Sequence, residues 1–320
     1  KIFKLMQKEN VEYVFMEVSS HAMDQDRVAG IDFKGGIFTN LSHDHLDYHK
    51  NFAEYFKAKK KFFDILPKGA FALSNTDDEH GELIYQNTKA KKYSYGFMGG
   101  ESFHGELFKS DFTGISARFN GENIHSKLLG KFNAYNLLAV FSACFLLKFS
   151  IHKVAMILED IKAPEGRFEY FTKNNITVIV DYAHSPDSLE KVILTASNLK
   201  KEGAKLITVF GCGGDRDPLK RRVMGKIGAT LSDIAILTSD NPRYENPEKI
   251  LDQMKTDLSM PELNKTETIL DRREAIARSI SLAKEGDIIL CAGKGHEDYQ
   301  EIKGVKHHFN DLEEYKKILK

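Results

Sequence analysis

Short apolar runs alternate with helix-like segments throughout the second half of the chain, and this alternation constrains the fold more than any other feature. The apolar runs are rich in β-branched residues, which favour strands. Strands that alternate with helices form a parallel sheet with helices on both faces. We therefore predict an α/β fold with a doubly wound sheet. The runs lie at residues 176–180, 206–210, 234–238 and 287–291, and helix-like stretches include residues 188–200 and 247–258.

Each of these predicted strands leads directly into a polar or glycine-rich segment. In open α/β sheets, ligands bind outside the carboxyl ends of the strands. Four such segments at one edge of a sheet therefore predict a single binding site. The segments are DYAH (181–184), GCGGDRD (211–217), SDNPR (239–243) and AGKGHE (292–297).

The first half of the chain is less regular. We expect a helix at its start, then a buried strand at residues 13–16, where the sequence reads YVFM. Asn120 and Gly121 follow an alternating run and are typical of a tight hairpin turn. The other expected elements are strands at residues 36–39, 70–73 and 115–119 and helices at residues 52–66, 133–148 and 152–161.

The segment Pro164-Glu165-Gly166-Arg167 is the strongest break in the chain, since Pro and Gly end regular structure. It separates the mixed first half from the regular second half. We therefore expect two domains, residues 1–165 and residues 166–320, each long enough to bury a core.

The composition is that of a soluble globular protein, with 42% hydrophobic and 29% charged residues. Basic and acidic residues number 46 each, which gives no reason to expect nucleic acid or an anionic membrane as partner. The longest apolar run is too short and interrupted to span a bilayer. Three widely spaced cysteines fit a reducing cytoplasm. The chain begins at Lys1 without Met, so we expect it to be a fragment.

Two segments of the first half contain candidate metal ligands. Glu17 ends the predicted strand at residues 13–16, where a carboxylate can hold a metal and the following serines can hold a substrate; a plain turn is the alternative. Residues 39–49 contain three histidines and two aspartates, His45 among them. This loop lacks Cys and the His-Glu-x-x-His spacing of zinc sites, which favours a hard cation such as Mg²⁺ together with a nucleotide.

Lys59 is distinguished from its neighbouring lysines by helical periodicity. The apolar stripe of the expected helix includes Tyr55 and Phe56, and position 59 lies on it at i+4 and i+3 from these residues. Lys59 should therefore point inward, whereas Lys57, Lys60 and Lys61 should point outward. A buried lysine loses its charge or is paired.

The predicted edge of the second sheet suits an amino acid with an additional carboxylate. Arg216 and Arg243 can grip carboxylates through two hydrogen bonds, and Glu297 can take an ammonium group. The residues Asp240-Asn241-Pro242 could also form an ordinary turn. The glycines at residues 211–214 suggest a phosphate cradle or a close backbone approach. The segment is not Gly-x-Gly-x-x-Gly and no acidic residue stands in the dinucleotide position, which disfavours a nicotinamide dehydrogenase. The sequence also contains no P-loop.

Taken together, these motifs resemble the Mur ligase family, and the resemblance covers nearly the whole chain in the order of the family. It implies a central ATPase-type α/β domain with a small β-rich segment, followed by a Rossmann-like C-terminal domain. The family's N-terminal UDP-binding domain and its Gly-Lys-Thr phosphate loop are not in this sequence, so we expect this chain alone to be inactive. The matching segments are MEVSSHAMDQDRV, FTNLSHDHLDYH, YFKAK, GKFNAYNLLA, PEGRFE, VDYAHSPDSL, VFGCGGDRD, SDNPRYENP and AGKGHEDYQ.

The resemblance implies an ATP- and Mg²⁺-dependent ligase that adds meso-diaminopimelate to UDP-N-acetylmuramoyl-L-alanyl-D-glutamate through an acyl phosphate, in cytoplasmic peptidoglycan synthesis. Glu17 and His45 match Mg²⁺ ligands, and Lys59 matches a carbamylated lysine beside a second Mg²⁺. Lys59, His45 and Arg167 are the implied catalytic residues. The implied binding residues are Ser19, Gln25 and Arg27 for the UDP substrate, Asn133, Asn136, Arg167 and Asp181 for the nucleotide, and Arg216, Asp240, Asn241, Arg243, Gly293 and Glu297 for diaminopimelate.

Three alternatives remain open at this point. Two are amide ligases of the same superfamily, either lysine-adding or similar to folylpolyglutamate synthase. The segment with Arg243 argues against both, since lysine lacks the carboxylate that the guanidinium would bind. The third alternative is an inactive binding fragment, and binding of labelled diaminopimelate would distinguish these possibilities.

Asn133, taken alone, is more readily explained as a helix N-cap than as a residue that binds a ligand.

Overall fold

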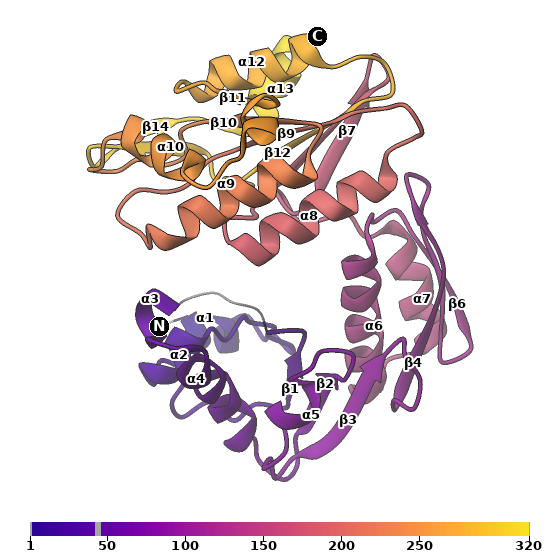
Figure 1. Cartoon of the computed structure of the whole chain (residues 1–320). Helices are drawn as coiled ribbons and strands as arrows, with labels where there is room; N and C mark the ends of the chain where they lie inside the picture. The colour runs from indigo at the N-terminus through magenta and orange to yellow at the C-terminus, as the bar shows by residue number, and fades with distance from the viewer. Residues whose placement is uncertain (1, 42–45, 320) are drawn as a thin grey trace.

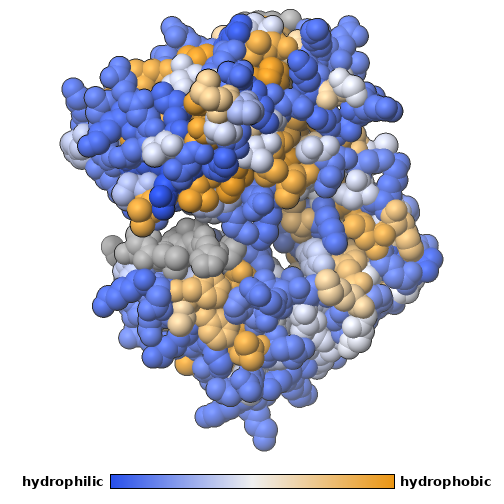
Figure 2. All heavy atoms as spheres, in the orientation of Figure 1, coloured by the Kyte–Doolittle hydropathy of each residue, from blue (hydrophilic) through white to orange (hydrophobic). Residues whose placement is uncertain are grey.

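The computed structural model describes residues 2–41 and 46–319 of the chain. Two β-sheets of six strands each form the centres of two lobes, which are drawn in indigo to purple and in pink through orange to yellow (Figure 1). Figure 2 shows a hollow between the two lobes, which are joined on one side. Within the described residues, no helix is long and apolar enough to cross a membrane.

The first sheet changes from parallel to antiparallel along its width. Its strands follow the order of the chain, with β1 to β4 parallel and β4, β5 and β6 antiparallel. The predicted hairpin turn joins β5 and β6, where Asn120 and Gly121 have φ angles of 44° and 90°. The strands are β1 (Gly35–Phe38), β2 (Phe71–Asn75), β3 (Lys91–Gly96), β4 (Phe103–Asp111), β5 (Gly114–Phe119) and β6 (Glu122–Ser126).

Helices cover both faces of this sheet because alternate strand residues point to opposite sides. Ala72 of β2 lies in a core with α2, α4 and α5, whereas its neighbour Leu73 lies in a core with α6 and α7. The helices are α1 (Ile2–Lys8), α2 (Ser20–Asp24), α3 (Leu46–His49), α4 (Phe52–Asp64), α5 (Gly81–Ile84), α6 (Lys131–Leu146) and α7 (Ile151–Asp160).

The predicted buried strand at residues 13–16 is wrong. Residues 11–19 form no regular structure, and the side chain of Phe15 is 72% exposed. A strand needs a hydrogen-bonded neighbour, and β1, the next strand along the chain, pairs only with β2 among the described strands. Val14, Phe15 and Met16 therefore line a cavity and do not pair in a sheet.

The second sheet has the predicted doubly wound form. Its order is β11-β10-β9-β12-β8-β7, and every pair is parallel except the edge pair β7–β8. All four apolar runs of the second half form strands, each buried on both faces. The strands are β7 (Glu169–Lys173), β8 (Ile176–Asp181), β9 (Leu206–Phe210), β10 (Ile234–Leu237), β11 (Thr266–Thr268) and β12 (Ile288–Ala292), and a hairpin adds β13 (Tyr299–Ile302) and β14 (Val305–His308).

Two hydrophobic cores lie on the two faces of this sheet. The face covered by α8, α9 and α10 packs Ile193 and Met224 against Phe210, while α12 and α13 pack Ile276 and Tyr315 against the opposite face (Figure 1). The helices are α8 (Pro186–Leu199), α9 (Leu219–Leu231), α10 (Pro247–Lys255), α11 (Met260–Leu263), α12 (Arg272–Leu282) and α13 (Asp311–Ile318).

We propose that the domain boundary lies between residues 165 and 166. The two sheets share no strand, and Lys162 and Arg167, on either side of the boundary, are exposed. Limited trypsin digestion should therefore release a stable C-terminal piece that begins near residue 166, identified by mass spectrometry. A fragment of residues 166–320 that is unfolded when it is expressed alone would contradict this boundary.

Candidate functional site

Loops that follow β9, β10 and β12 meet at the carboxyl edge of the second sheet, where ligands bind in such folds. A Cβ atom on Gly213 would lie 3.0 Å from Nη1 of Arg243 and 3.9 Å from Cγ of Arg216. A Cβ atom on Gly293 would lie 2.8 Å from Oδ2 of Asp240, and Gly293 has a φ of +115°, which other residues rarely adopt. The structure thus places these predicted residues of three loops together.

Arg243 is held in position by its backbone and its side chain. Its N–H donates to the carbonyl of Glu301 at 3.0 Å, and its carbonyl accepts from Lys303 N at 2.7 Å. Nη1 donates to the carbonyl of Gly214 at 2.6 Å, and Nε lies 3.5 Å from Oε2 of Glu301. The side chain remains 21% exposed, so a fixed guanidinium is presented at the edge of the sheet.

Asn241 and Glu297 are hydrogen-bonded to each other at the same edge. Nδ2 of Asn241, a residue that is 2% exposed, donates to Oε2 of Glu297 at 2.8 Å. Lys294 contacts both, although no pattern in the sequence singles it out. A lysine in a glycine-rich loop is ordinarily a surface residue. The partners of Lys294 become evident only in the structure, where the loops after β10 and β12 come together.

Arg221 and Glu245 are a second feature that the sequence did not reveal. Arg221 on α9 is 1% exposed, and its Nη1 and Nη2 bind the two carboxylate oxygens of Glu245 at 2.8 and 2.7 Å. This pairing holds the pKa of Glu245 below its usual range. Arg221 Nη2 also donates to the carbonyl of Gly213 at 3.3 Å. The pair therefore joins the loop of Arg216 to the loop of Arg243.

Cys212 lies in the glycine-rich loop but is not a plausible nucleophile. It is 3% exposed, and burial raises the pKa of its thiol to about 12. Since the thiolate is the reactive form, a thiol with such a pKa is inert at neutral pH. The chemistry of this edge therefore depends on charged and amide groups.

Asp181 and Arg167, the predicted nucleotide-site residues, lie beside one another. Oδ2 and Oδ1 of Asp181 accept from the backbone N–H groups of Phe168 and Ala183, both at 2.7 Å. Burial nevertheless raises the pKa of Asp181. The guanidinium of Arg167 lies 4.8 Å from the ring centre of Tyr182, the residue after Asp181. The carboxylate thus orders the backbone around an exposed cation.

Asn133 is not the N-cap of its helix, contrary to the interpretation that its sequence position favours. The helix α6 begins at Lys131 after Gly130, which leaves Asn133 inside the first turn. Its Nδ2 donates to the carbonyl of Leu129 at 2.8 Å, and its Oδ1 accepts from Asn136 Nδ2 at 3.1 Å. The two asparagines form one polar pair at the start of α6.

Glu17 and Lys59 line the same cavity in the first lobe. The cavity has a volume of about 750 Å³ and lies between residues 14–18, β1 and α4. The ammonium of Lys59 lies 5.4 Å from the ring centre of Tyr55. The structure therefore brings together two of the three predicted metal-site residues. The third, His45, lies outside the described residues.

The inward direction that periodicity predicts for Lys59 agrees with its partial burial, and Lys57 is exposed as expected. Lys60 departs from the prediction, because its side chain is only 15% exposed and pairs with Asp64 at 2.6 Å. Lys61 is exposed and donates to the carboxylate of Asp26 at 2.8 Å. The ion pair with Asp64, one helical turn further along the chain, holds the side chain of Lys60 against the helix.

The three residues predicted for the UDP substrate lie at or near α2. Ser19 is the N-cap of this helix, and its Oγ accepts from Ala22 N at 3.2 Å. Gln25 is exposed and donates to the hydroxyl of Tyr48 at 3.1 Å. Arg27 is exposed. Two of these side chains are thus accessible, and Ser19 has at least a structural role.

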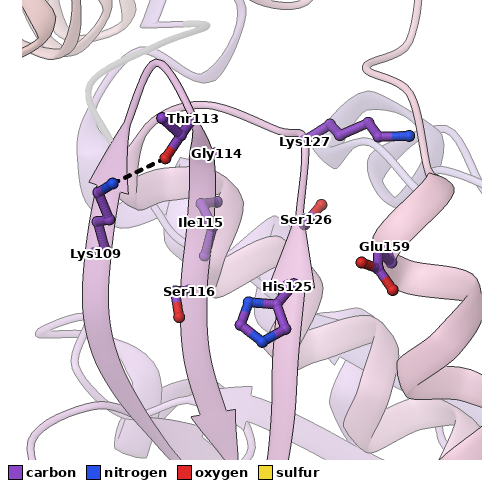
Figure 3. Close-up of a pocket in the computed structure, with 9 residues that line it drawn as sticks. All are labelled: Lys109, Thr113, Gly114, Ile115, Ser116, His125, Ser126, Lys127 and Glu159. Atoms are coloured by element: carbon purple, nitrogen blue, oxygen red, sulfur yellow. Dashed lines mark hydrogen bonds between the residues drawn. The ribbon is translucent and has the colours of Figure 1, made fainter.

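A second cavity of about 380 Å³ lies between β4, β5, β6 and α7 (Figure 3). Its cations already have partners. Lys109 donates to Thr113 Oγ1 and pairs with Asp111, both at 3.0 Å, and Lys127 pairs with Asp160 at 3.0 Å. It contains none of the predicted residues, so we do not assign a function to it.

The comparison with known proteins defines the class of protein. Residues 1–144 match the sequence model of the Mur ligase middle domain, and residues 166–295 match that of the Mur ligase glutamate ligase domain. The chain belongs to the Mur ligase family.

Within this family, the chain is similar to proteins named UDP-N-acetylmuramoyl-L-alanyl-D-glutamate–2,6-diaminopimelate ligase. It is 49% identical over 315 residues to the one from Bacteroides thetaiotaomicron, which covers 98% of this chain and 65% of that protein. It is also 49% identical to the one from Cytophaga hutchinsonii, over 100% of this chain and 66% of that protein. The chain thus spans about 65% of the length of these curated relatives.

Solved structures agree with this assignment. A structure of a diaminopimelate ligase of the same name matches with a TM-score of 0.62 and 34% identity, covering 95% of this chain and 63% of that one. A MurF ligase from Thermotoga maritima in complex with ADP matches with a TM-score of 0.67 but 15% identity, covering 94% of this chain and 65% of that one. The second likeness concerns the fold alone.

Proposed function

We propose that the chain supplies the nucleotide-binding and amino-acid-binding parts of a cytoplasmic ligase that adds meso-diaminopimelate to UDP-N-acetylmuramoyl-L-alanyl-D-glutamate. The observation that carries the proposal is the cluster of Arg216, Arg243, Asn241 and Glu297 at the carboxyl edge of the second sheet. The names of the 49% identical relatives support the same substrates.

The cluster suits one end of diaminopimelate, which carries a carboxylate and an ammonium group on the same carbon. The guanidinium groups of Arg243 and Arg216 offer donors to the carboxylate. The carboxylate of Glu297 offers an acceptor to the ammonium. Lysine has no carboxylate at that end, so its binding would leave the Arg243 guanidinium without a new partner.

The proposed reaction joins two substrates through an acyl phosphate. The side-chain carboxylate of the D-glutamyl residue attacks the γ-phosphorus of ATP, and ADP leaves. The neutral amine of diaminopimelate then attacks the acyl carbon, the amide bond forms, and phosphate leaves with the bonding electrons while the amine loses its proton. Cationic groups that stabilise the developing negative charge accelerate such steps.

Residues of both lobes are assigned to ATP and Mg²⁺ in this proposal. Glu17, His45 and the carbamate of Lys59 would hold the cations, since a hard ion prefers oxygen ligands and Glu17 and Lys59 line the same cavity. Mg²⁺ would supply charge neutralisation at the phosphates. The exposed guanidinium of Arg167 would contact phosphate, Asp181 would lie at the ribose, and Asn133 with Asn136 would lie near adenine.

The exposed region around α2 is assigned to the UDP-muramoyl substrate. Gln25 and Arg27 offer an amide and a cation to the solvent, and Ser19 lies at the N-terminus of the helix. Arg27 would pair with a phosphate or carboxylate of that substrate.

Arg243→Ala should raise the Michaelis constant for diaminopimelate by about 30-fold or more. Removing one partner of a desolvated charge pair costs about 2–5 kcal/mol, and each 1.4 kcal/mol is tenfold. The Michaelis constant for ATP should change little. The measurement is steady-state kinetics of the complete protein with each substrate varied in turn.

Arg222→Ala is the matched control, because Arg222 is an exposed arginine on α9 whose Nε lies 3.9 Å from Asp257. It should behave as the unmodified protein. If Arg243→Ala raises the constant for ATP and leaves that for diaminopimelate unchanged, Arg243 belongs to the nucleotide site.

A further inference from the structure

Lys294 is a fully buried lysine in the loop after β12. Its relative exposure is 0%, whereas lysine is almost never buried unless its charge is paired. It stands between Gly293 and Glu297, two residues of the proposed diaminopimelate pocket. A buried ammonium group at this place must be stabilised by the groups that it contacts.

Two acceptors share the ammonium of Lys294. Its Nζ donates to Oδ1 of Asn241 at 3.0 Å and to Oε2 of Glu297 at 3.1 Å. Nζ also lies 5.5 Å from the ring centre of Tyr299. Because Asn241 in turn donates to the same Oε2 of Glu297 at 2.8 Å, the three side chains form a closed ring of hydrogen bonds.

This ring fixes the orientation of both partners. The amide of Asn241 has its oxygen toward two donors, Lys294 Nζ and the backbone N of Glu301, and its nitrogen toward Glu297. The carboxylate of Glu297 has Oε2 engaged by two donors. Its Oε1 has no hydrogen-bond partner in the part of the chain that the structure describes, and the side chain is 16% exposed.

We propose that Lys294 is a positioning residue that directs the unoccupied Oε1 of Glu297 toward the ammonium group of the amino-acid substrate. The inference rests on the proposed function and adds to it the group that orients the ammonium acceptor. Lys294 does not attract the substrate, since its own charge repels an ammonium. Its contribution is to prevent Glu297 and Asn241 from adopting other rotamers, as preorganisation of a binding site requires.

A double-mutant cycle in the complete protein tests this role. The variants are Lys294→Met, Glu297→Gln and the two combined, with the Michaelis constants for diaminopimelate and ATP measured for each. Lys294→Met should raise the constant for diaminopimelate about tenfold or more, the effect of losing hydrogen bonds to a charged group, and leave the constant for ATP unchanged. The double variant should be no worse than Glu297→Gln alone, because Lys294 acts through Glu297.

Lys306→Met is the matched control. The ammonium of Lys306 lies 3.8 Å from the ring centre of the same Tyr299, but the residue is exposed. This variant should keep the Michaelis constants of the unmodified protein. Thermal unfolding followed by circular dichroism establishes that each variant is folded. If Lys294→Met does not fold, Lys294→Leu replaces it, since leucine is also uncharged and can donate to neither Asn241 nor Glu297.

An unchanged or lower Michaelis constant for diaminopimelate in a folded Lys294 variant would overturn the inference. So would losses that multiply in the double variant, because they would show that Lys294 acts independently of Glu297. Failure of the proposed function is a separate outcome: the unmodified protein would then not use diaminopimelate, and the same cycle would be run with the amino acid that it does use.

Discussion

Lys59→Ala is expected to lower the turnover number of the complete ligase by about 100-fold or more. Lys59 lies in one cavity with Glu17, and its proposed carbamate would supply oxygen ligands to a cation beside the transferred phosphoryl group. Loss of a single group that stabilises transition-state charge typically costs on the order of 10²–10³ in rate. The measurement is phosphate release at saturating substrates, compared with the unmodified protein.

The control for this prediction is Lys61→Ala. Lys61 lies on the same helix, but its ammonium binds the carbonyl of Met23 and the carboxylate of Asp26 outside the cavity. It should retain near-normal turnover. A short carboxylic acid added to Lys59→Ala should restore part of the activity, since it can replace the carbamate. Near-normal activity of Lys59→Ala, or an equal loss in Lys61→Ala, would show that the lysine has been wrongly assigned.

The second large effect is expected on stability, at the ion pair between Arg272 and Asp311. Both side chains are 0% exposed, and Nε and Nη2 of the arginine bind the two carboxylate oxygens at 2.7 Å each. Arg272 also donates to the carbonyl of Ala292 at 3.1 Å, so the pair joins α12 and α13 to the end of β12. Breaking a buried pair leaves one charge uncompensated, which costs about 3–5 kcal/mol.

Asp311→Asn should therefore lower the free energy of unfolding by about 3–5 kcal/mol, as measured by urea denaturation with circular dichroism. Glu267→Gln is the control, because it removes one partner of an exposed pair with Arg278 at 2.8 Å. Exposed pairs contribute little to stability. If Asp311→Asn is as stable as this control, the buried pair does not anchor the last helix as we propose.

The second half of the fold was predictable from the sequence because its strands are buried on both faces. A strand in the middle of a parallel sheet is covered on both faces, so it consists of a continuous apolar run. The run at residues 206–210 is such a strand, and β9 has the same first and last residues as predicted. Residues 13–16 have the same apolar character but remain exposed. The apolar pattern of a segment indicates that its side chains prefer to be buried. A strand forms only if its backbone can also hydrogen-bond to a neighbouring strand.

The candidate site was predictable where it follows from strand ends. Arg216, Arg243 and Glu297 come after three neighbouring parallel strands, so their meeting is a consequence of sheet topology. Lys294 and Arg221 could not be found in this way. Their importance depends on which acceptors they reach, and those acceptors come from other loops, with Glu245 lying 24 residues from Arg221. The spacing of residues in the sequence does not show which side chains of different loops meet in the fold.

The central claim is that the complete protein adds meso-diaminopimelate to a UDP-muramoyl dipeptide. The direct test is to incubate it with UDP-N-acetylmuramoyl-L-alanyl-D-glutamate, ATP and Mg²⁺, together with either meso-diaminopimelate or L-lysine, and to identify the products by mass spectrometry. We predict one new amide product with diaminopimelate, equimolar ADP, and little product with lysine. Equal or greater use of lysine, or ADP formation without an amide product from either amino acid, would contradict the account.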